Sequence, residues 1–326
     1  MNERTMSPKP QLPYVGIRTF MKRPYQADWT TIDADIAVLG APFDYGTAVR
    51  PGARFGPSAI REASQMHSAL NGHYDPDEDK VFLDPAEIRI VDLGDVPMIH
   101  FDAMQCIDNI REAVESVAAS GAFLLVLGGD HSVHAPCIEG FRASGHNSIH
   151  IVHLDAHLDY VDERMGVRYG QGNPLRRAAE LPFVSGITHI GIRGVGSSGP
   201  DDFRDARATK SRIVTMKEFR RIGVQAALAQ IPEEAVVYFT VDIDGFDASL
   251  VPGTGTPSYG GLTYDDGIEI VSQVAMTRRC IGMDFVELAP VLDASGASAL
   301  FASQFLTTSL CQIFRPGTPT WKALQG

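Results

Sequence analysis

Short runs of β-branched and apolar residues recur along the chain, and each is followed by a turn and a stretch with helical periodicity. We expect eight strands, at residues 35–39, 88–93, 123–127, 149–154, 187–192, 213–216, 236–241 and 280–288. The clearest helical patterns cover residues 101–119, 263–276 and 297–313. Strands that are apolar almost throughout and alternate with helices are typical of a parallel sheet covered on both faces. The pattern therefore predicts a three-layer α/β/α fold with a central, mainly parallel eight-stranded sheet.

No long linker rich in Gly, Ser or Pro divides the chain of 326 residues, and no internal repeat is visible. We expect a single domain over residues 1–326, with residues 1–14 as a flexible N-terminal segment. That segment is polar and lacks the apolar core of a signal peptide, and no apolar run is long enough to span a bilayer. These features predict a cytoplasmic protein that does not bind membranes.

The composition fits a soluble globular protein, with 44% hydrophobic and 21% charged residues. The formal net charge of −12 argues against nucleic-acid binding, because a phosphate backbone requires a basic surface. An acidic chain is compatible with a cationic small molecule or with divalent metal ions. The cysteines at positions 106, 137, 280 and 311 are widely separated, so we expect buried thiols in a reducing compartment.

Three segments share one design, in which an apolar strand ends in Asp or His residues. They read Leu-Gly-Gly-Asp-His-Ser at 127–132, His-Leu-Asp-Ala-His-Leu-Asp at 153–159 and Val-Asp-Ile-Asp-Gly at 241–245. Alternate residues of a strand point to the same face. Asp155, His157 and Asp159 would therefore project together if the strand stayed extended to its end, and Asp242 and Asp244 would do so too. In an open α/β sheet, ligands bind beyond the carboxyl ends of the strands.

Carboxylates buried side by side at strand ends cost many kcal/mol unless a positive charge compensates them. A set of four Asp and two His drawn from these segments suits a divalent ion such as Mn²⁺. This many ligands, with bridging carboxylates among them, suggests two ions about 3.5 Å apart that hold a nucleophilic hydroxide between them. For any single segment, a solvated strand end or a helix N-cap is the alternative. That alternative accounts poorly for all three segments together.

The three segments resemble the signatures of the ureohydrolases, the arginase and agmatinase superfamily. The third segment continues along residues 242–261 as the long family signature does, with Thr240 where Ser is usual. Residues 16–20, 38–44 and 50–57 are similar to the agmatinase branch rather than to arginase itself. The resemblance extends from about residue 15 to about residue 313 and implies an arginase-like fold.

The resemblance also implies a role for each matching residue. One metal site would consist of His131, Asp155, Asp159 and Asp242, and the other of Asp155, His157, Asp242 and Asp244. Asp155 and Asp242 would bridge the two ions, with Mn²⁺ expected and Ni²⁺ as the alternative. Glu287 would grip a guanidinium group, and Asp159 would relay a proton to the leaving amine. The implied reaction is hydrolysis of a guanidino compound to urea and an amine. The implied assembly is a homo-oligomer, a trimer or hexamer, with a hetero-oligomer as the alternative.

The turn after the second segment departs from the family pattern. Family members carry a His that is thought to shuttle protons, whereas this chain has Gln171, which cannot titrate. We place Gln171 in the catalytic set with Asp159 and Glu287. The loop at 160–172 follows the ligand-bearing strand directly, so we expect it to contact the tail of the substrate. The residues expected to bind substrate are Glu287, Tyr160, Arg168, Gln171 and Asn173.

The charges of this loop leave the substrate open. Asp162 and Glu163 favour a second amine, as in agmatine, whereas Arg164 and Arg168 favour a carboxylate, as in guanidinobutyrate. Gln171 also admits a small or N-alkylated guanidine or a biguanide, such as guanidine, dimethylguanidine or a metformin-like compound. The Leu-Ala-Pro sequence that follows Glu287, where Val-Asn-Pro or Val-Ser-Pro is usual, adds to this uncertainty in the substrate.

Other interpretations compete with this one. Residues 194–199 spell G-x-G-x-x-G after a strand, as in dinucleotide-binding folds, but the stretch before the next strand is short for a crossover helix. We therefore expect a glycine-rich active-site loop there. The histidines at 134, 146, 150, 153 and 189 lack partners at ligand spacing, although His153 is placed to lie behind the metals. A non-catalytic partner subunit would not need six ligands, and a phosphoryl or amide hydrolase would not predict Glu287.

Overall fold

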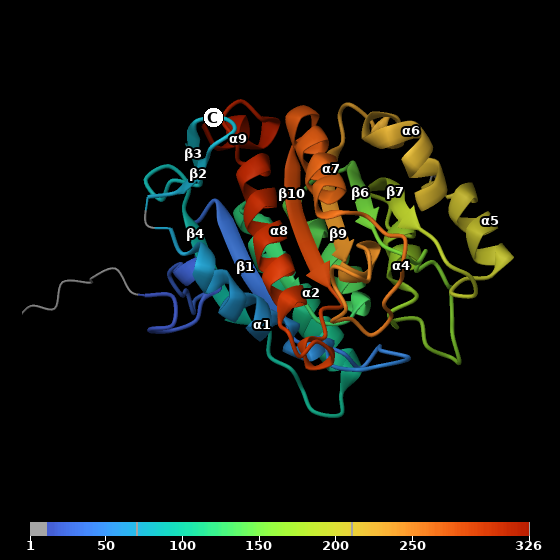
Figure 1. Ribbon diagram of the computed structural model, residues 1–326. Coiled ribbons are helices and arrows are strands. Elements are labelled where there is room, and N and C mark those ends of the chain that lie inside the picture. The colour runs from blue at the N-terminus through green and yellow to red at the C-terminus, as the bar shows by residue number, and fades with distance from the viewer. Residues whose placement is uncertain (1–11, 70, 210, 326) are drawn as a thin grey trace, which may run out of the picture.

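Eight parallel strands form the central sheet of the computed structural model, which describes residues 12–69, 71–209 and 211–325 (Figure 1). In space the strands follow the order β4-β1-β5-β10-β9-β6-β7-β8. Their bounds are β1 (Ile36–Ala41), β4 (Ile90–Asp95), β5 (Phe123–Gly128), β6 (Ile149–Leu154), β7 (Val184–Ile192), β8 (Ser211–Thr215), β9 (Val236–Asp242) and β10 (Cys280–Val286). All eight expected strands are confirmed, and every neighbouring pair in the sheet is parallel.

Helices cover both faces of this sheet. The first face carries α1 (Gly56–Ala63), α6 (Met216–Leu228), α7 (Tyr264–Thr277), α8 (Ala297–Ile313) and α9 (Pro319–Gln325). The second face carries α2 (Ala103–Ser120), α3 (His134–Gly140), α4 (Pro174–Ala179) and α5 (Pro200–Ala208). In Figure 1, α7 and α8 lie in front of the sheet and α2 lies behind it. The expected three-layer α/β/α fold is confirmed, and the three predicted helices correspond to α2, α7 and α8.

The strands are apolar on both faces because each face packs against helices. In β5, Phe123, Leu125 and Leu127 belong to the core under the first set of helices, and Leu124 and Val126 belong to the core under the second set. This alternation within an unbroken apolar run is the reason why the run predicts a buried strand. The four cysteines are free and buried, as expected.

Some elements were not anticipated. A short antiparallel hairpin joins β2 (His73–Asp75) and β3 (Lys80–Phe82). The stretch after the glycine-rich sequence at 194–199 does contain a helix, α5, although it was considered short for one. Its first turn is stabilised because the backbone N–H of Gly199 donates to Oδ2 of Asp202 (2.7 Å). Short 3-10 helices occur at Phe20–Lys22, Ala53–Phe55, Ser64–His67, His131–Val133, Phe141–Ser144, Ile243–Gly245 and Pro290–Leu292.

The N-terminal expectation falls mainly outside the described residues, because residues 1–11 are not among them. Leu12 and Tyr14, which belong to the segment 1–14, are exposed. The single domain over residues 1–326 stays a prediction. Within the described residues, no helix combines the length and the apolar character needed to cross a bilayer.

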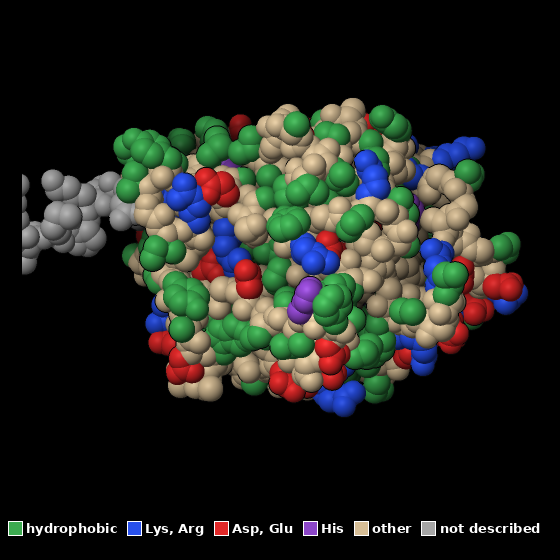
Figure 2. All heavy atoms as spheres, turned by 90° about the horizontal axis from the view of Figure 1, so that it is seen from below, with side chains coloured by type: hydrophobic (Ala, Val, Ile, Leu, Met, Phe, Trp, Pro, Cys, Tyr) green, Lys and Arg blue, Asp and Glu red, His purple; other side chains and the backbone are tan. Residues whose placement is uncertain are grey.

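The order of the strands brings distant parts of the chain to one edge. The four central strands are β5, β10, β9 and β6, and all of them are parallel, so their carboxyl ends meet. The three motif segments follow β5, β6 and β9, and Glu287 follows β10. The arrow of β10 points to the lower side of Figure 1. Figure 2 views the molecule from that side and shows Lys and Arg side chains interspersed with Asp and Glu side chains.

Candidate metal centre

His131 lies at the centre of a first group of ligand atoms. It begins the 3-10 helix that follows β5, and its side chain is fully buried. From its Nδ1 atom, the nearest carboxylate oxygens are Oδ2 of Asp159 at 2.9 Å, Oδ2 of Asp155 at 3.1 Å and Oδ2 of Asp242 at 3.4 Å. The structure therefore gathers the four residues expected in one metal site.

A second group lies beside the first and shares Asp155 with it. Nδ1 of His157 is 3.1 Å from Oδ2 of Asp244 and 3.5 Å from Oδ1 of Asp155. Asp155 thus directs Oδ2 toward His131 and Oδ1 toward His157, as a carboxylate that bridges two ions would do. Oδ1 of Asp242 accepts a hydrogen bond from the backbone N–H of Asp244 (2.8 Å). All six expected ligands are brought together at one place.

The backbone that holds these ligands is not an extended strand. We expected Asp155, His157 and Asp159 to project together from β6, but β6 ends at Leu154. A turn follows, in which the backbone N–H of His157 donates to Oδ1 of Asp155 (2.5 Å), and Asp159 has a left-handed backbone with φ of 52°. A non-glycine residue in this conformation carries strain, which the surrounding structure must offset. The ligands therefore converge through a tight loop rather than through strand alternation.

The tautomer of His131 leaves a lone pair among the carboxylates. The Thr240 hydroxyl donates to Oδ1 of the buried Asp284 (2.5 Å), so its oxygen accepts from Nε2–H of His131 (2.9 Å). Nδ1 of neutral His131 is then unprotonated, and within the described chain it has no hydrogen-bond partner. A bare nitrogen facing three carboxylate oxygens is favourable only with a cation between them, so these residues fit a divalent metal ion. The candidate ligand groups that include Asp155 support this conclusion.

Without metal, protons would have to compensate the buried charges. Burial and neighbouring carboxylates raise the pKa of Asp242 well above its usual value, and burial and Asp155 raise the pKa of Asp159. Burial opposes protonation of the two histidines, but the carboxylates outweigh it. They raise the pKa of His131 well above its usual value and the pKa of His157 to about 12. Metal binding would displace these protons, because a ligand atom must be deprotonated.

A cavity of about 220 Å³ opens beside the ligands. Its lining residues are Ala48, Val49, His157, Asp159, Arg164, Gln171, Gly172, Gly196, Ser197, Ser198, Asp242, Thr256 and Glu287. Glu287 is buried, with φ of 64°, and its Oε1 accepts from the backbone N–H of His131 (2.9 Å). Burial, and next the charge of Asp130, raise the pKa of Glu287 well above its usual value, so a cation is needed beside it to favour the carboxylate.

The geometry agrees with the comparisons to known proteins. Residues 34–311 match the Arginase family. The chain belongs to the arginase family. It is 33% identical over 304 residues to a human protein named guanidino acid hydrolase, mitochondrial, with 92% of this chain and 83% of the relative covered. It is 34% identical over 314 residues to agmatinase, mitochondrial, from Gallus gallus, with 94% and 88% covered.

A solved arginase-family relative has the same fold. The structure of proclavaminate amidino hydrolase from Streptomyces clavuligerus superimposes with a TM-score of 0.79 at 32% identity. The match covers 92% of this chain and 98% of that chain. The resemblance inferred from the motifs is therefore confirmed, as is the arginase-like fold.

Three residues expected to contact the substrate of this arginase-family protein are not among those that line this cavity. The Tyr160 side chain is fully buried, and its hydroxyl contacts Thr209. Asn173 is buried and holds the loop by accepting from the backbone N–H of Gly170 (2.9 Å). Arg168 is exposed and pairs with carboxylates of its own surface, those of Asp162 and Glu180. These side chains shape the loop, and those of Gln171 and Arg164 line the cavity.

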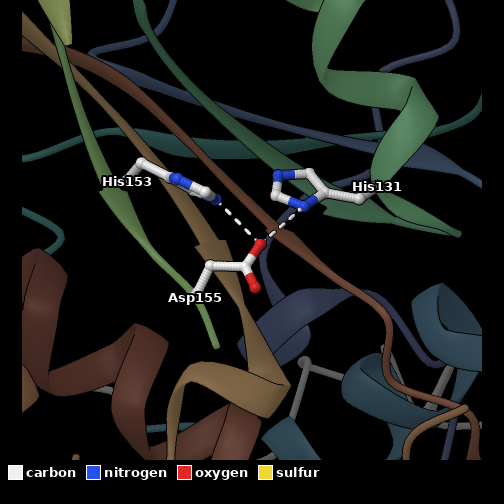
Figure 3. Close-up of side chains that lie close together, drawn as sticks. All are labelled: His131, His153 and Asp155. Atoms are coloured by element: carbon white, nitrogen blue, oxygen red, sulfur yellow. Dashed lines mark hydrogen bonds and ion pairs between the residues drawn. The ribbon is translucent and has the colours of Figure 1, made fainter. Parts of the chain in front are cut away.

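The structure also reveals residues that the motif analysis missed. Thr240 and Asp284 fix the tautomer of His131, and Nδ1 of His134 lies 2.7 Å from Oδ2 of Asp284. A signal existed for Thr240, because it lies two residues before Asp242 on the same strand. Figure 3 shows His153 and His131 approaching the same oxygen of Asp155, with Nε2 of His153 at 2.8 Å. The placement of His153 behind the ligands is as expected. Gly196, Ser197 and Ser198 of the glycine-rich loop line the cavity.

Proposed function

We propose that this protein hydrolyses a guanidino compound to urea and an amine, with two divalent metal ions as cofactors. The observation that carries this proposal is the pair of ligand groups that share Asp155 next to a cavity with a buried Glu287. When bound, the cations would lower the pKa of water and so supply a hydroxide as the nucleophile for the guanidino carbon. Membership of the arginase family, with relatives named for guanidino substrates, supports the same reaction class.

The residues of the chain have distinct roles in this proposal. Glu287 would bind the planar guanidinium group through paired charge-assisted hydrogen bonds. Asp159 lines the cavity and also faces His131, so it can accept a proton and pass it to the leaving amine. Gln171 lines the same cavity and would donate or accept a hydrogen bond without titrating.

We propose Mn²⁺ as the native metal and retain Ni²⁺ as the alternative. Imidazole nitrogens suit both ions, whereas a site rich in carboxylates favours Mn²⁺. Assembly into a homo-oligomer (trimer or hexamer) or a hetero-oligomer stays a prediction, as does location in the cytoplasm. The two vertebrate relatives above are described as mitochondrial.

We propose a guanidino acid as the substrate. Among the described residues that line the cavity, Arg164 is the only Lys or Arg, whereas Asp162 and Glu163 are absent from the lining. Asp162 is already paired with Arg177 (2.5 Å). With its guanidinium group at Glu287, a substrate could therefore place a carboxylate at Arg164, where the second amine of agmatine would be repelled. A small guanidine without a tail remains the second candidate, because the cavity is small.

Urea release from a panel of compounds tests the function. The metal-loaded protein would be incubated with guanidinobutyrate, guanidinopropionate, agmatine, arginine, guanidine and dimethylguanidine. We expect the highest kcat/KM with a guanidino acid. Highest activity with guanidine or dimethylguanidine would replace the guanidino acid with the second candidate. No urea from any compound, with both metals bound, would refute the reaction and favour the non-catalytic subunit.

Replacing Arg164 tests the choice of substrate within the class. For Arg164→Ala we expect KM for guanidinobutyrate to rise about 10–100-fold, because one charge-assisted hydrogen bond of about 1.5–3 kcal/mol is lost. The kcat value should change little, since the contact is remote from the reacting carbon. Arg168→Ala is the matched control on the same loop, and its kinetics should equal those of the unaltered protein. Equal KM values for Arg164→Ala and the unaltered protein would contradict the role.

A further inference from the structure

Two buried histidines that take no part in the proposed reaction lie directly behind Asp155. His153 on β6 and His189 on β7 are partners in the parallel register of these strands. Both side chains are fully buried, and their Nδ1 atoms are 2.8 Å apart. The other nitrogen of His153, Nε2, is 2.8 Å from Oδ2 of Asp155 (Figure 3). The two rings and the carboxylate are therefore linked by two consecutive hydrogen bonds.

The positions of the protons in these two hydrogen bonds follow from the groups at either end, Asp155 and His189. Asp155 must be deprotonated to ligate metal, so Nε2 of His153 carries the proton and donates it to Oδ2. If His153 is neutral, its Nδ1 accepts from Nδ1–H of His189, and Nε2 of His189 is bare. That atom is buried and has no hydrogen-bond partner in the part of the chain that the structure describes.

The reverse arrangement is disfavoured. If His153 carried protons on both nitrogens, neutral His189 would have to accept at Nδ1 and bury an unpaired N–H at Nε2. An unsatisfied buried donor costs about 1–3 kcal/mol. Burial also lowers the pKa of His189 well below its usual value, which favours its neutral form. Only one arrangement of protons thus gives every N–H of His153 and His189 an acceptor.

We propose that His153, held in one tautomer by His189, is a positioning residue that orients Asp155 as the bridge between the two metal ions. This inference rests on the metal centre of the proposed function. The backbone N–H of His157 holds Oδ1 of Asp155, and His153 holds Oδ2, so each oxygen is fixed from outside and keeps lone pairs for an ion. Hydrogen bonds of this kind around a metal site are worth 10–100-fold in metal affinity.

Two variants of His153 separate the hydrogen bond from packing. His153→Phe keeps the ring volume and removes the donor, whereas His153→Gln places an amide N–H near the position of Nε2. The amount of unbound Mn²⁺, measured by its EPR spectrum during titration of the metal-free protein, gives affinity and stoichiometry without substrate. We expect His153→Phe to bind Mn²⁺ about 10–100-fold more weakly and His153→Gln to recover most of the loss, with two ions bound at saturation in both.

A control and a second pair of variants complete the test. His150→Gln is the matched control, because His150 is also buried on β6 but its Nε2 contacts Thr188 (2.9 Å) rather than a ligand. Its Mn²⁺ affinity should be unchanged. His189→Leu should weaken Mn²⁺ binding, and His189→Asn, whose amide can replace Nδ1–H, should restore it.

Each contrary result has a definite meaning. Unaltered Mn²⁺ affinity in folded His153→Phe would overturn the proposal. Loss of one bound ion in both His153 variants would also overturn it and make His153 a direct ligand, since its Nε2 belongs to a candidate ligand group with His131 and Asp155. Weaker binding in His150→Gln to the same extent would show a general packing effect. Because binding is measured without substrate, failure of the unaltered protein to release urea would refute the reaction and leave this result intact.

Discussion

Asp242→Asn is expected to reduce urea release by about a thousandfold or more, which corresponds to about 4 kcal/mol of barrier height. Asp242 is buried at the end of β9, with Oδ2 beside His131 and Oδ1 held by the backbone of Asp244. Asparagine keeps the shape and one acceptor oxygen, but it removes the negative charge and the second oxygen ligand. Both ions lose a shared ligand in the proposed centre, so we expect the variant to contain clearly less metal.

Elemental analysis and a urea assay on the same samples measure this effect. Asp265→Asn is the control, because Asp265 is an exposed carboxylate in the first turn of α7 and its loss removes the same charge. The control should retain its metal and its activity. If Asp242→Asn kept a full metal complement and normal turnover, the two-metal centre described above would be wrong.

The sequence revealed the strands reliably because both faces of the sheet are covered. Leu124 and Leu125 pack into different cores, and this leaves an unbroken apolar run that few other structures explain. The β2–β3 hairpin was not detected because each strand has three residues and only Phe82 among them is buried, so burial imposes little pattern on the sequence. The order of strands in the sheet was also hidden, since it depends on long-range packing.

The residues predicted to ligate metal do lie together, but the physical reason given for this was incomplete. Alternation along an extended strand does not explain Asp159, whose backbone is left-handed. The ligands come together because β10 and β9 lie between β5 and β6 in the sheet. No local sequence pattern indicates this order of strands. The hydrogen bonds between His131 and Thr240 and between His153 and His189 join residues far apart in the sequence, so these pairs become visible only in the folded chain.

The loop at 160–173 shows where reasoning from sequence position is weakest. Tyr160 comes directly after the last ligand and carries a polar tip, so a contact with substrate was a reasonable expectation. In the structure its ring enters the core, and Arg164 reaches the cavity instead. Side-chain direction in an irregular loop is set by local turns and by partners such as Thr209, and neither has a periodic signature in the sequence.

Glu287→Gln is expected to lower kcat/KM by roughly a hundredfold to ten-thousandfold while the metal content stays unchanged. Glu287 lies in the cavity wall outside the two ligand groups, and its carboxylate would meet the guanidinium group of the substrate. Removing one partner of a buried ion pair costs about 3–5 kcal/mol, which is the source of this range. Glutamine retains an oxygen for the backbone N–H of His131, and it keeps the same side-chain length at a backbone with positive φ.

The comparison with Asp242→Asn makes this result specific. Both variants should lose activity, but only Asp242→Asn should lose metal, because of these two residues only Asp242 directs a carboxylate oxygen at Nδ1 of His131. Steady-state kinetics with guanidinobutyrate and elemental analysis distinguish the two patterns. Loss of metal in Glu287→Gln would show that Glu287 acts by positioning His131, whose backbone N–H donates to it, rather than by binding the substrate. Unchanged kinetics with a full metal complement would show that Glu287 does not bind the substrate. The guanidinium group would then need another anion in this cavity.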